Sequence, residues 1–369
     1  MMDSTTTLPP ALSFGEAAQM KVREHEDAFP VPVGTRSVPP GTTTAATVAD
    51  LETPTYYGLP MLKEPVWKLA VPLYFWLGGA AGAASTLSFA ARVLGGRALD
   101  PLARRARLVA AIGETVGAGL LTYDLGRPSR FYNMLRVFNP RSPMSVGSWV
   151  LSGSGAANTG ALLLQNRRGF FGALGDLAGA TGALLGMPLA GYTAVLLANT
   201  AVPVWNLGRR SLPLLFMASS VATAGSLLSL TAASERERVV VQRYAIAGKV
   251  GELAATAALH LEVRRASPRA ARPLTRGLSG TLLTAATVLT ATSLIGSLTA
   301  GRSRRRARNA AILGALGSLA LRFAIHHAGK QSARDPRASF SSQRRAMQRQ
   351  GIERQGIERQ GMTSRASST

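Results

Sequence analysis

The chain has 369 residues, of which 46% are apolar and only 17% are charged, and its formal net charge is +23. It contains no cysteine, which excludes disulfides, thiolate metal sites and iron–sulfur clusters held by this chain alone. The arginines stand in short runs between apolar segments, and no basic stretch carries the interleaved aromatic residues that stack on bases. This distribution predicts a membrane protein whose arginines meet lipid headgroups, and it argues against nucleic acid as a partner.

The chain divides into three parts by composition. Residues 1–55 are rich in Thr, Pro and Ser and lack the apolar core of a signal peptide, so we expect a disordered soluble arm. Residues 330–369 are polar and basic and contain the repeat RQGIERQGIERQG, which predicts a disordered tail of low complexity. A transmembrane domain is expected between them, over residues 56–329.

Eight apolar segments predict eight transmembrane helices, since each approaches the roughly 20 residues needed to cross the hydrocarbon core. Lipid leaves an open chain no other way than a helix to satisfy its backbone groups. The predicted fold class is therefore all-α integral membrane. The arginines of the connections favour both termini on the outer side. The predicted spans are 69–91, 108–123, 142–164, 177–208, 211–234, 244–261, 277–301 and 309–329.

The connection over residues 123–149 is polar at both ends and amphipathic in the middle, which predicts a short helix at the membrane surface. For Asp124 and Arg127 we favour a structural clasp at this turn over direct catalysis. Arg130 is expected to face a partner protein or lipid.

Ionisable residues inside the predicted spans are costly in hydrocarbon, so each one carries a functional hypothesis. Glu114 is either a proton relay or an acid bonded to a hydroxyl of a neighbouring helix. Lys249 and Glu252 are three residues apart on one helical face and predict an internal ion pair, with a proton relay as the alternative. Only four histidines are present, which excludes two haems with histidine ligands alone, and we expect no haem or metal in this chain.

Several short motifs resemble the NrfD family, the quinone-reactive membrane subunits of polysulfide, nitrite and related oxidoreductases. They are YYGLP from Tyr56, GGAAG from Gly78, DLGRP from Asp124 and SPMSVGSW ending at Trp149. The resemblance covers residues 56–328. It implies two four-helix bundles, menaquinone or ubiquinone as the cofactor, and location in the bacterial plasma (inner) membrane. It also implies two partners, a four-cluster ferredoxin-like iron–sulfur subunit and a molybdopterin catalytic subunit.

The resemblance also indicates a site. The stretch YTAVLLANTAVPVWN is similar to the segment that begins with the quinone-site tyrosine of the polysulfide reductase membrane subunit, and Tyr192 matches that tyrosine. The first span has Val71–Tyr74 where that subunit has Asn and His, so Tyr74 is expected to act as the donor instead. We predict quinone binding by Tyr192, Tyr74, Asn199 and Trp205, with proton transfer by Asp124, Glu114 and Glu252.

The predicted function is that of a membrane subunit of a respiratory oxidoreductase complex. This subunit passes electrons between quinol and a partner's iron–sulfur clusters, and it does not catalyse a reaction by itself. Three alternatives remain open. One is a proton-translocating module of a larger respiratory complex, in which Glu114, Lys249 and Glu252 matter most. The others are a purely structural membrane anchor and a solute transporter, which would need broken helices in matched halves.

Overall fold

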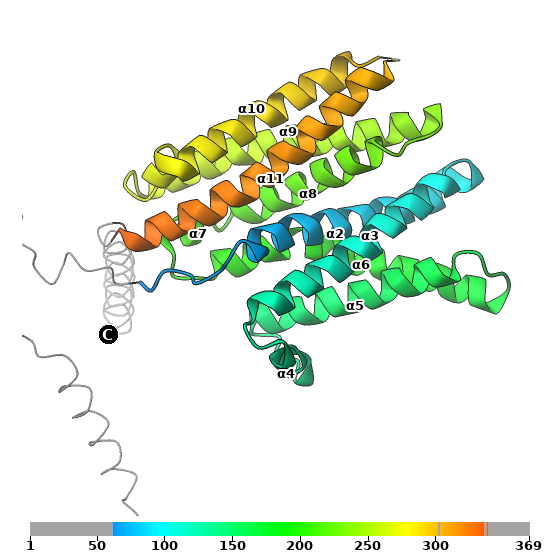
Figure 1. The fold of residues 1–369 in the computed structure, drawn as a ribbon, viewed down its shortest axis with the longest axis horizontal. Coiled ribbons are helices and arrows are strands. Elements are labelled where there is room, and N and C mark those ends of the chain that lie inside the picture. Colours follow the sequence, from blue (N-terminus) through cyan, green and yellow to red (C-terminus); the bar gives the residue numbers. More distant parts are fainter. Residues whose placement is uncertain (1–61, 302, 336–337, 339–369) are drawn as a thin grey trace, which may run out of the picture. The chain divides into compact units, whose positions relative to one another are not determined.

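The structure, a computed structural model, describes residues 62–301, 303–335 and 338, and this part of the chain is helical and without β-strands. Most of it belongs to eight helices of 19 to 32 residues (Figure 1). They are α2 (Ala70–Gly95), α3 (Asp100–Asp124), α5 (Pro143–Leu164), α6 (Phe170–Ala198), α8 (Ser211–Ser229), α9 (Glu235–Ala266), α10 (Gly277–Thr299) and α11 (Arg304–Arg334).

Four of the described helices, α6, α8, α10 and α11, are long and apolar enough to cross a membrane, and a fifth span results if α3 is joined to the bent segment after it. The eight predicted spans are therefore not confirmed. The other long helices are less apolar for two reasons: α9 has charged residues at both ends, and α2 and α5 are rich in Gly, Ala and Ser. On α10, outward apolar side chains such as Ile295 and Leu298 are 62% exposed, as suits contact with lipid.

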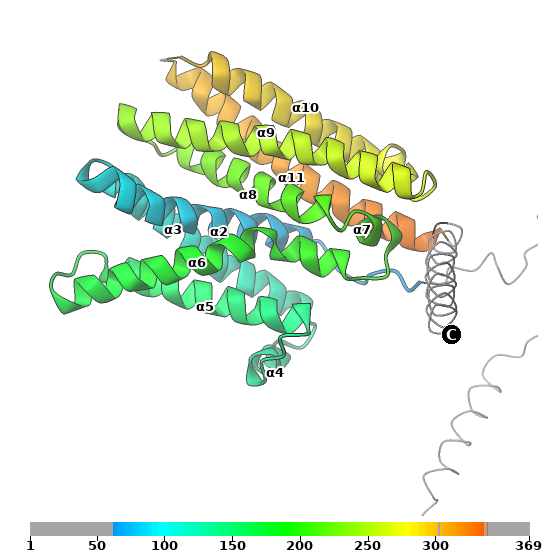
Figure 2. The same ribbon diagram turned by 180° about the vertical axis from the view of Figure 1, so that it is seen from behind.

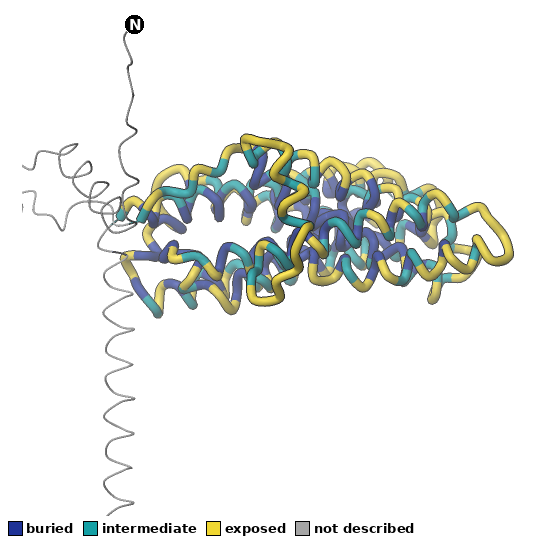
Figure 3. The backbone as a smooth tube through the Cα atoms, turned by 90° about the horizontal axis from the view of Figure 1, so that it is seen from below, coloured by how far each residue is buried: buried dark blue, intermediate teal, exposed yellow. Residues whose placement is uncertain are grey.

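The long helices pack in two groups. In the first helix group, α2 contacts α3 and α6, and α5 contacts α3 and α6. In the second helix group, α9 contacts α8 and α10, and α11 contacts α8 and α10. Contacts of α8 with α2 and α6 join the two groups (Figure 2). Buried residues lie on the inward sides of the helices and exposed residues on the outward sides (Figure 3).

Glycines permit the closest helix contacts. A methyl group on Gly82 of α2 would overlap the backbone oxygen of Gly186 on α6, and one on Gly186 would lie 2.6 Å from the backbone oxygen of Gly82. In α9, a methyl group on Gly248 would overlap the backbone of Ala222 on α8. Such small-residue ridges are what allow helices in lipid to approach closely.

The connection between α3 and α5 contains the short helix predicted there. Gly126 has a φ of 71°, and a turn of 3-10 helix (Pro128–Arg130) leads into α4 (Phe131–Arg136). The segment Pro128–Arg136 is bent by 114° from α3, so it crosses the direction of the long helices. Ser142 then caps α5 by accepting a hydrogen bond from the amide of Ser145 at 3.4 Å.

The predicted boundaries differ from the structure at several places, and two of these differences move a segment into another element. The span predicted over 177–208 is divided, because α6 ends at Ala198 and a separate helix, α7 (Pro203–Leu207), follows. Pro203 has no N–H group, so it starts a new helix rather than continuing the old one. Also, α11 extends through residues 330–334, which the composition assigned to the tail. The predicted N-terminal arm and the rest of the C-terminal tail lie outside the described residues.

Candidate functional site

A cavity of about 280 Å³ lies at one end of the first helix group. It is formed where α2 and α5 begin, where α3 and α6 end, and where the α4 segment passes. Most of its lining is apolar or aromatic, with four polar side chains. The lining residues are Val66, Trp67, Val71, Tyr74, Phe75, Leu121, Asp124, Leu125, Met134, Met144, Gly147, Ser148, Tyr192 and Leu196.

Two tyrosines from different helices give this cavity its hydroxyl groups. Tyr74 of α2 is 3% exposed and Tyr192 of α6 is half-buried, and they are close enough to interact electrostatically. Within the part of the chain that the structure describes, neither phenol has a hydrogen-bond partner. Since buried polar groups in native proteins are normally paired, two free donors in one apolar cavity point to a ligand with acceptor atoms.

The rings of both tyrosines lie against glycines: Tyr74 against Gly78 of its own helix and Gly117 of α3, and Tyr192 against Gly147 of α5. Methyl groups on Gly78 or Gly117 would lie 3.3 Å from ring carbons of Tyr74, which is tight contact. A methyl group on Gly147 of α5 would overlap Cζ, Oη and Cε1 of Tyr192. The ring of Tyr192 therefore occupies space that exists only because residue 147 has no side chain.

Asp124 lies at the mouth of the cavity and fastens two helices to each other. Its Oδ1 accepts a hydrogen bond from the amide of Lys68 at 3.2 Å, which connects the end of α3 to the start of α2. The predicted clasp had Asp124 accept backbone amides at the turn and Arg127 meet phosphates or Asp124; the amide that Asp124 accepts is that of Lys68, and no contact between Asp124 and Arg127 is among those of the described residues. Arg127 and Arg130 are exposed and form no ion pair with any described residue.

Asn199 and Trp205, which the sequence assigned to the same site, do not line the cavity. Asn199 caps α6, with its Nδ2 donating to the Val195 carbonyl at 2.8 Å. Trp205 is fully buried, and its Nε1 donates to the Ile325 carbonyl of α11 at 2.9 Å. It stacks on Trp67 of the cavity lining, with ring centroids 5.6 Å apart and planes 16° apart.

Glu114 is buried deeper in the first helix group, away from the cavity lining. Its carboxyl accepts from Ser154 Oγ at 2.5 Å and from Asn158 Nδ2 at 3.0 and 3.1 Å. Ser85 of α2 donates in turn to Asn158 Oδ1 at 2.8 Å. This network joins α2, α3 and α5. The Ser154 hydroxyl of α5 is a partner of the kind expected if Glu114 is an acid bonded to a hydroxyl of a neighbouring helix.

The predicted ion pair between Lys249 and Glu252 is not among the contacts of the described residues. Lys249 Nζ instead donates to Ser297 Oγ at 2.8 Å, and Glu252 Oε1 accepts from Thr290 Oγ1 at 2.7 Å. Both hydroxyls come from α10. Hydropathy identifies helices but does not show which helices are neighbours, so the contact between α9 and α10 could not be predicted from it. Arg322 of α11 is also buried, with NH2 donating to the Phe216 carbonyl at 2.9 Å.

Several residues of the cavity were not assigned to it from sequence. Trp67 and Phe75 provide its aromatic wall, and Met134, Met144 and Gly147 come from the connection after α3 and the start of α5. The SPMSVGSW motif contains two of these residues, Met144 and Gly147, so this motif was the feature of the sequence that could have indicated them. Only packing shows that its glycine makes room for Tyr192.

This fold defines a multi-helical membrane protein with a cavity at the ends of its helices. The chain belongs to the family described as "Polysulphide reductase, NrfD", whose sequence model matches residues 59–332. This family consists of membrane subunits of oxidoreductases, which typically partner with iron–sulfur and molybdopterin subunits. No curated protein matches the sequence.

Proposed function

We propose that this chain is the quinone-binding membrane subunit of an oxidoreductase complex and exchanges electrons with a partner iron–sulfur subunit, which is attached to a molybdopterin subunit. In this proposal all eight long helices cross a bacterial plasma membrane as two four-helix bundles. The observation that carries it is the cavity with two unpartnered tyrosine hydroxyls, one from α2 and one from α6.

The residues of the cavity fit the headgroup of a quinone. Its volume of about 280 Å³ lies near the lower end of ligand pockets, which span about 300–1,000 Å³. Trp67 and Phe75 offer aromatic surfaces to a flat ring. The hydroxyls of Tyr74 and Tyr192 can each donate to a carbonyl oxygen, which is the acceptor that a quinone presents.

A bound quinol would supply two electrons on oxidation and would release two protons, which must leave the cavity. Asp124 is the group of the cavity best suited to move a proton, because it lines the cavity and is partly exposed at its mouth. Its Oδ1 is engaged by the Lys68 amide, which holds the carboxylate in place and leaves Oδ2 available. Tyr74 and Tyr192 orient the headgroup through their hydroxyls.

The partner is proposed to dock beside this cavity. Arg127 and Arg130 are exposed on the connection that closes the cavity, and Arg136 and Arg141 follow on the same connection. Four exposed guanidinium groups close to the site would attract an acidic face of a partner protein and orient its encounter.

Quinone binding can be tested on the full chain in lipid nanodiscs by titrating a quinone and following quenching of tryptophan fluorescence. We expect saturable quenching that weakens in Tyr192→Phe, because one hydrogen bond is lost, and that is reduced in amplitude in Trp67→Phe. Tyr132→Phe is the matched control, since Tyr132 is 76% exposed and lies outside the cavity lining. Quenching that is equal in Tyr192→Phe and the control would favour a purely structural anchor instead.

A further inference from the structure

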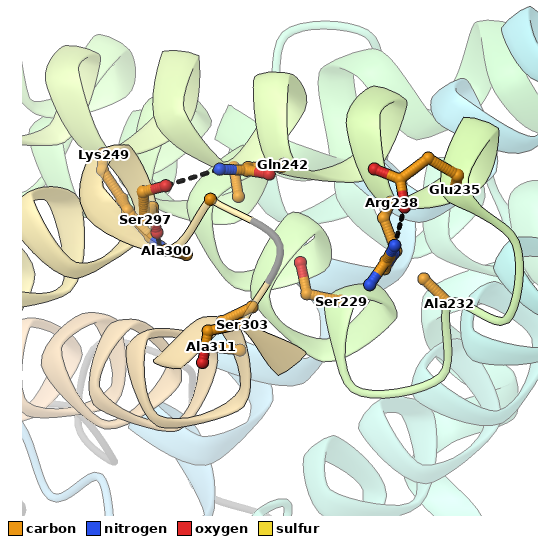
Figure 4. Close-up of a pocket in the computed structure, with 13 residues that line it drawn as sticks. Ser229, Ala232, Glu235, Arg238, Gln242, Lys249, Ser297, Ala300, Ser303 and Ala311 are labelled. Atoms are coloured by element: carbon orange, nitrogen blue, oxygen red, sulfur yellow. Dashed lines mark hydrogen bonds and ion pairs between the residues drawn. The ribbon is translucent and has the colours of Figure 1, made fainter. Parts of the chain in front are cut away.

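A second pocket lies in the second helix group, between the first half of α9, the end of α10 and the start of α11 (Figure 4). Glu235 and Arg238, which form an ion pair, stand on one side of it, and Lys249 and Ser297 stand on another. Its volume is about 40 Å³. A water molecule needs about 10–15 Å³ of such volume, whereas ligand pockets start near 300 Å³. The pocket therefore admits water and excludes larger solutes.

Lys249 forms the inner end of this pocket. Its Nζ donates to Ser297 Oγ at 2.8 Å, and Gln242 Nε2 donates to the Ser297 carbonyl at 2.5 Å. Lys249 is 1% exposed, yet the pocket reaches it from the side where Glu235 is exposed to solvent. Gly314 of α11 makes this position possible, because a methyl group there would lie 2.9 Å from Lys249 Cε.

Glu252 lies one turn further along α9 and is 2% exposed. Its Oε1 accepts from Thr290 of α10, while its Oε2 has no hydrogen-bond partner among the described residues. The charged groups that act on it are Arg322 of α11 and Lys249 of its own helix, and its neighbour on α8 is the hydroxyl residue Ser219. Nε and NH1 of Arg322 also lack partners in the described part of the chain.

These groups are costly where they lie. Two cations and one carboxyl are withdrawn from water, and hydroxyls and the Phe216 carbonyl rather than direct ion pairs satisfy them, so packing alone gives no reason to keep them. The combination of a buried base, a buried acid three residues away and a pocket large enough for water is what proton transfer requires.

We infer that Lys249 and Glu252 form a proton-exchange site and that the pocket between α9, α10 and α11 is its route to water. Since the two groups are not in direct contact, the Lys249 ammonium gives a proton to the Glu252 carboxylate by way of a water molecule, which leaves a neutral amine and a carboxylic acid. The amine then takes a proton from a hydronium ion in the pocket, which leaves water. As a net result, the site takes up one proton from water. The reverse steps release this proton to water through the same pocket. This inference goes beyond the proposed function and does not depend on quinone binding.

The test is infrared spectroscopy of the full chain in lipid nanodiscs over a pH series, in light and heavy water. We expect the carbonyl stretch of a protonated carboxylic acid to grow as the pH falls, to shift in heavy water and to be lost in Glu252→Gln. Lys249→Gln should change the pH at which this band grows. Glu114→Gln is the matched control, because it removes the buried acid of the other helix group and should leave the band intact.

The route is tested with Ala307→Phe, which places a ring in the pocket and leaves Lys249 and Glu252 themselves unchanged. Ala307 lines the pocket on α11 and is half-buried, so the ring can be accommodated at the pocket's edge. We expect hydrogen–deuterium exchange of the Glu252 band to slow in this variant. A carboxylic-acid spectrum that is the same in Glu252→Gln and in the wild type would overturn the site, and unchanged exchange in Ala307→Phe would overturn the route. Neither result bears on the fluorescence titration of the first cavity.

Discussion

Gly147 offers the sharpest test of the quinone site, because replacing it with alanine changes one methyl group at the position that the Tyr192 ring occupies. The methyl group of Gly147→Ala would overlap the phenol of Tyr192, so the ring must leave its position or the helices must move apart. In either case the hydroxyl no longer points into the cavity as it does now. The variant therefore perturbs Tyr192 without altering its chemistry.

The expected magnitude follows from two opposing effects on stability. Alanine favours a helix over glycine by up to about 1 kcal/mol, whereas forcing a methyl group into packed space costs about 1–3 kcal/mol. Gly160→Ala, on the same helix, is the matched control, because a methyl group there meets nothing within 4 Å. Gly147→Ala should thus be less stable than Gly160→Ala by about 1–3 kcal/mol, since helix propensity cancels in the comparison.

The assay is a pair of measurements on both alanine variants, thermal denaturation and quinone titration. A hydrogen bond contributes about 0.5–1.5 kcal/mol net, so Gly147→Ala should weaken quinone binding roughly two- to tenfold, and Gly160→Ala should not weaken it. In a Tyr192→Ala background, Gly147→Ala should lose most of its cost, because the overlapping ring is gone. Equal melting temperatures and equal affinities for the two alanine variants would refute the reasoning.

Three further changes test other contacts. Tyr74→Phe should leave the melting temperature unchanged, because no protein group loses a hydrogen bond, and should weaken quinone binding by about 0.5–1.5 kcal/mol in a titration; a large loss of stability would show that the hydroxyl is structural. Trp205→Phe removes the hydrogen bond that joins α7 to the Ile325 carbonyl, and the loss of that bond should lower the free energy of unfolding by about 0.5–1.5 kcal/mol; unchanged thermal denaturation would contradict this. The Arg334 guanidinium, hydrogen-bonded to Glu64 at 2.8 Å, holds the pKa of that carboxyl below its ordinary value of 4.5. The stabilisation is therefore complete above that value and is lost as the pH falls through the lowered pKa. Glu64→Gln should accordingly melt below the wild type at neutral pH and converge with it in acid, and a difference that does not change with pH would contradict the linkage.

The sequence by itself determined the helical character of this protein. Long apolar segments without strand periodicity predict helices, because hydropathy is a local property. The short helix after Asp124 was also predicted, since its amphipathic pattern and its flanking turn residues are local signals.

The tertiary structure alone decided which side chains share a space. Tyr74, Asp124 and Tyr192 meet at one cavity because three helix ends lie at the same level, but Asn199 and Trp205 do not reach it. The break between α6 and α7 turns the chain away, and Trp205 then packs against α11. Such a change of direction depends on contacts with a helix more than a hundred residues away.

The same reason explains the residues in the second helix group. On one helix, Lys249 and Glu252 form a plausible ion pair by spacing, but hydroxyls of α10 and a cation of α11 compete for them in the folded protein. Local sequence specifies which residues a helix presents, and it does not specify how far the helix is rotated or which neighbour it faces. Those two quantities are fixed by the packing of all the helices at once, and they decide which polar groups meet.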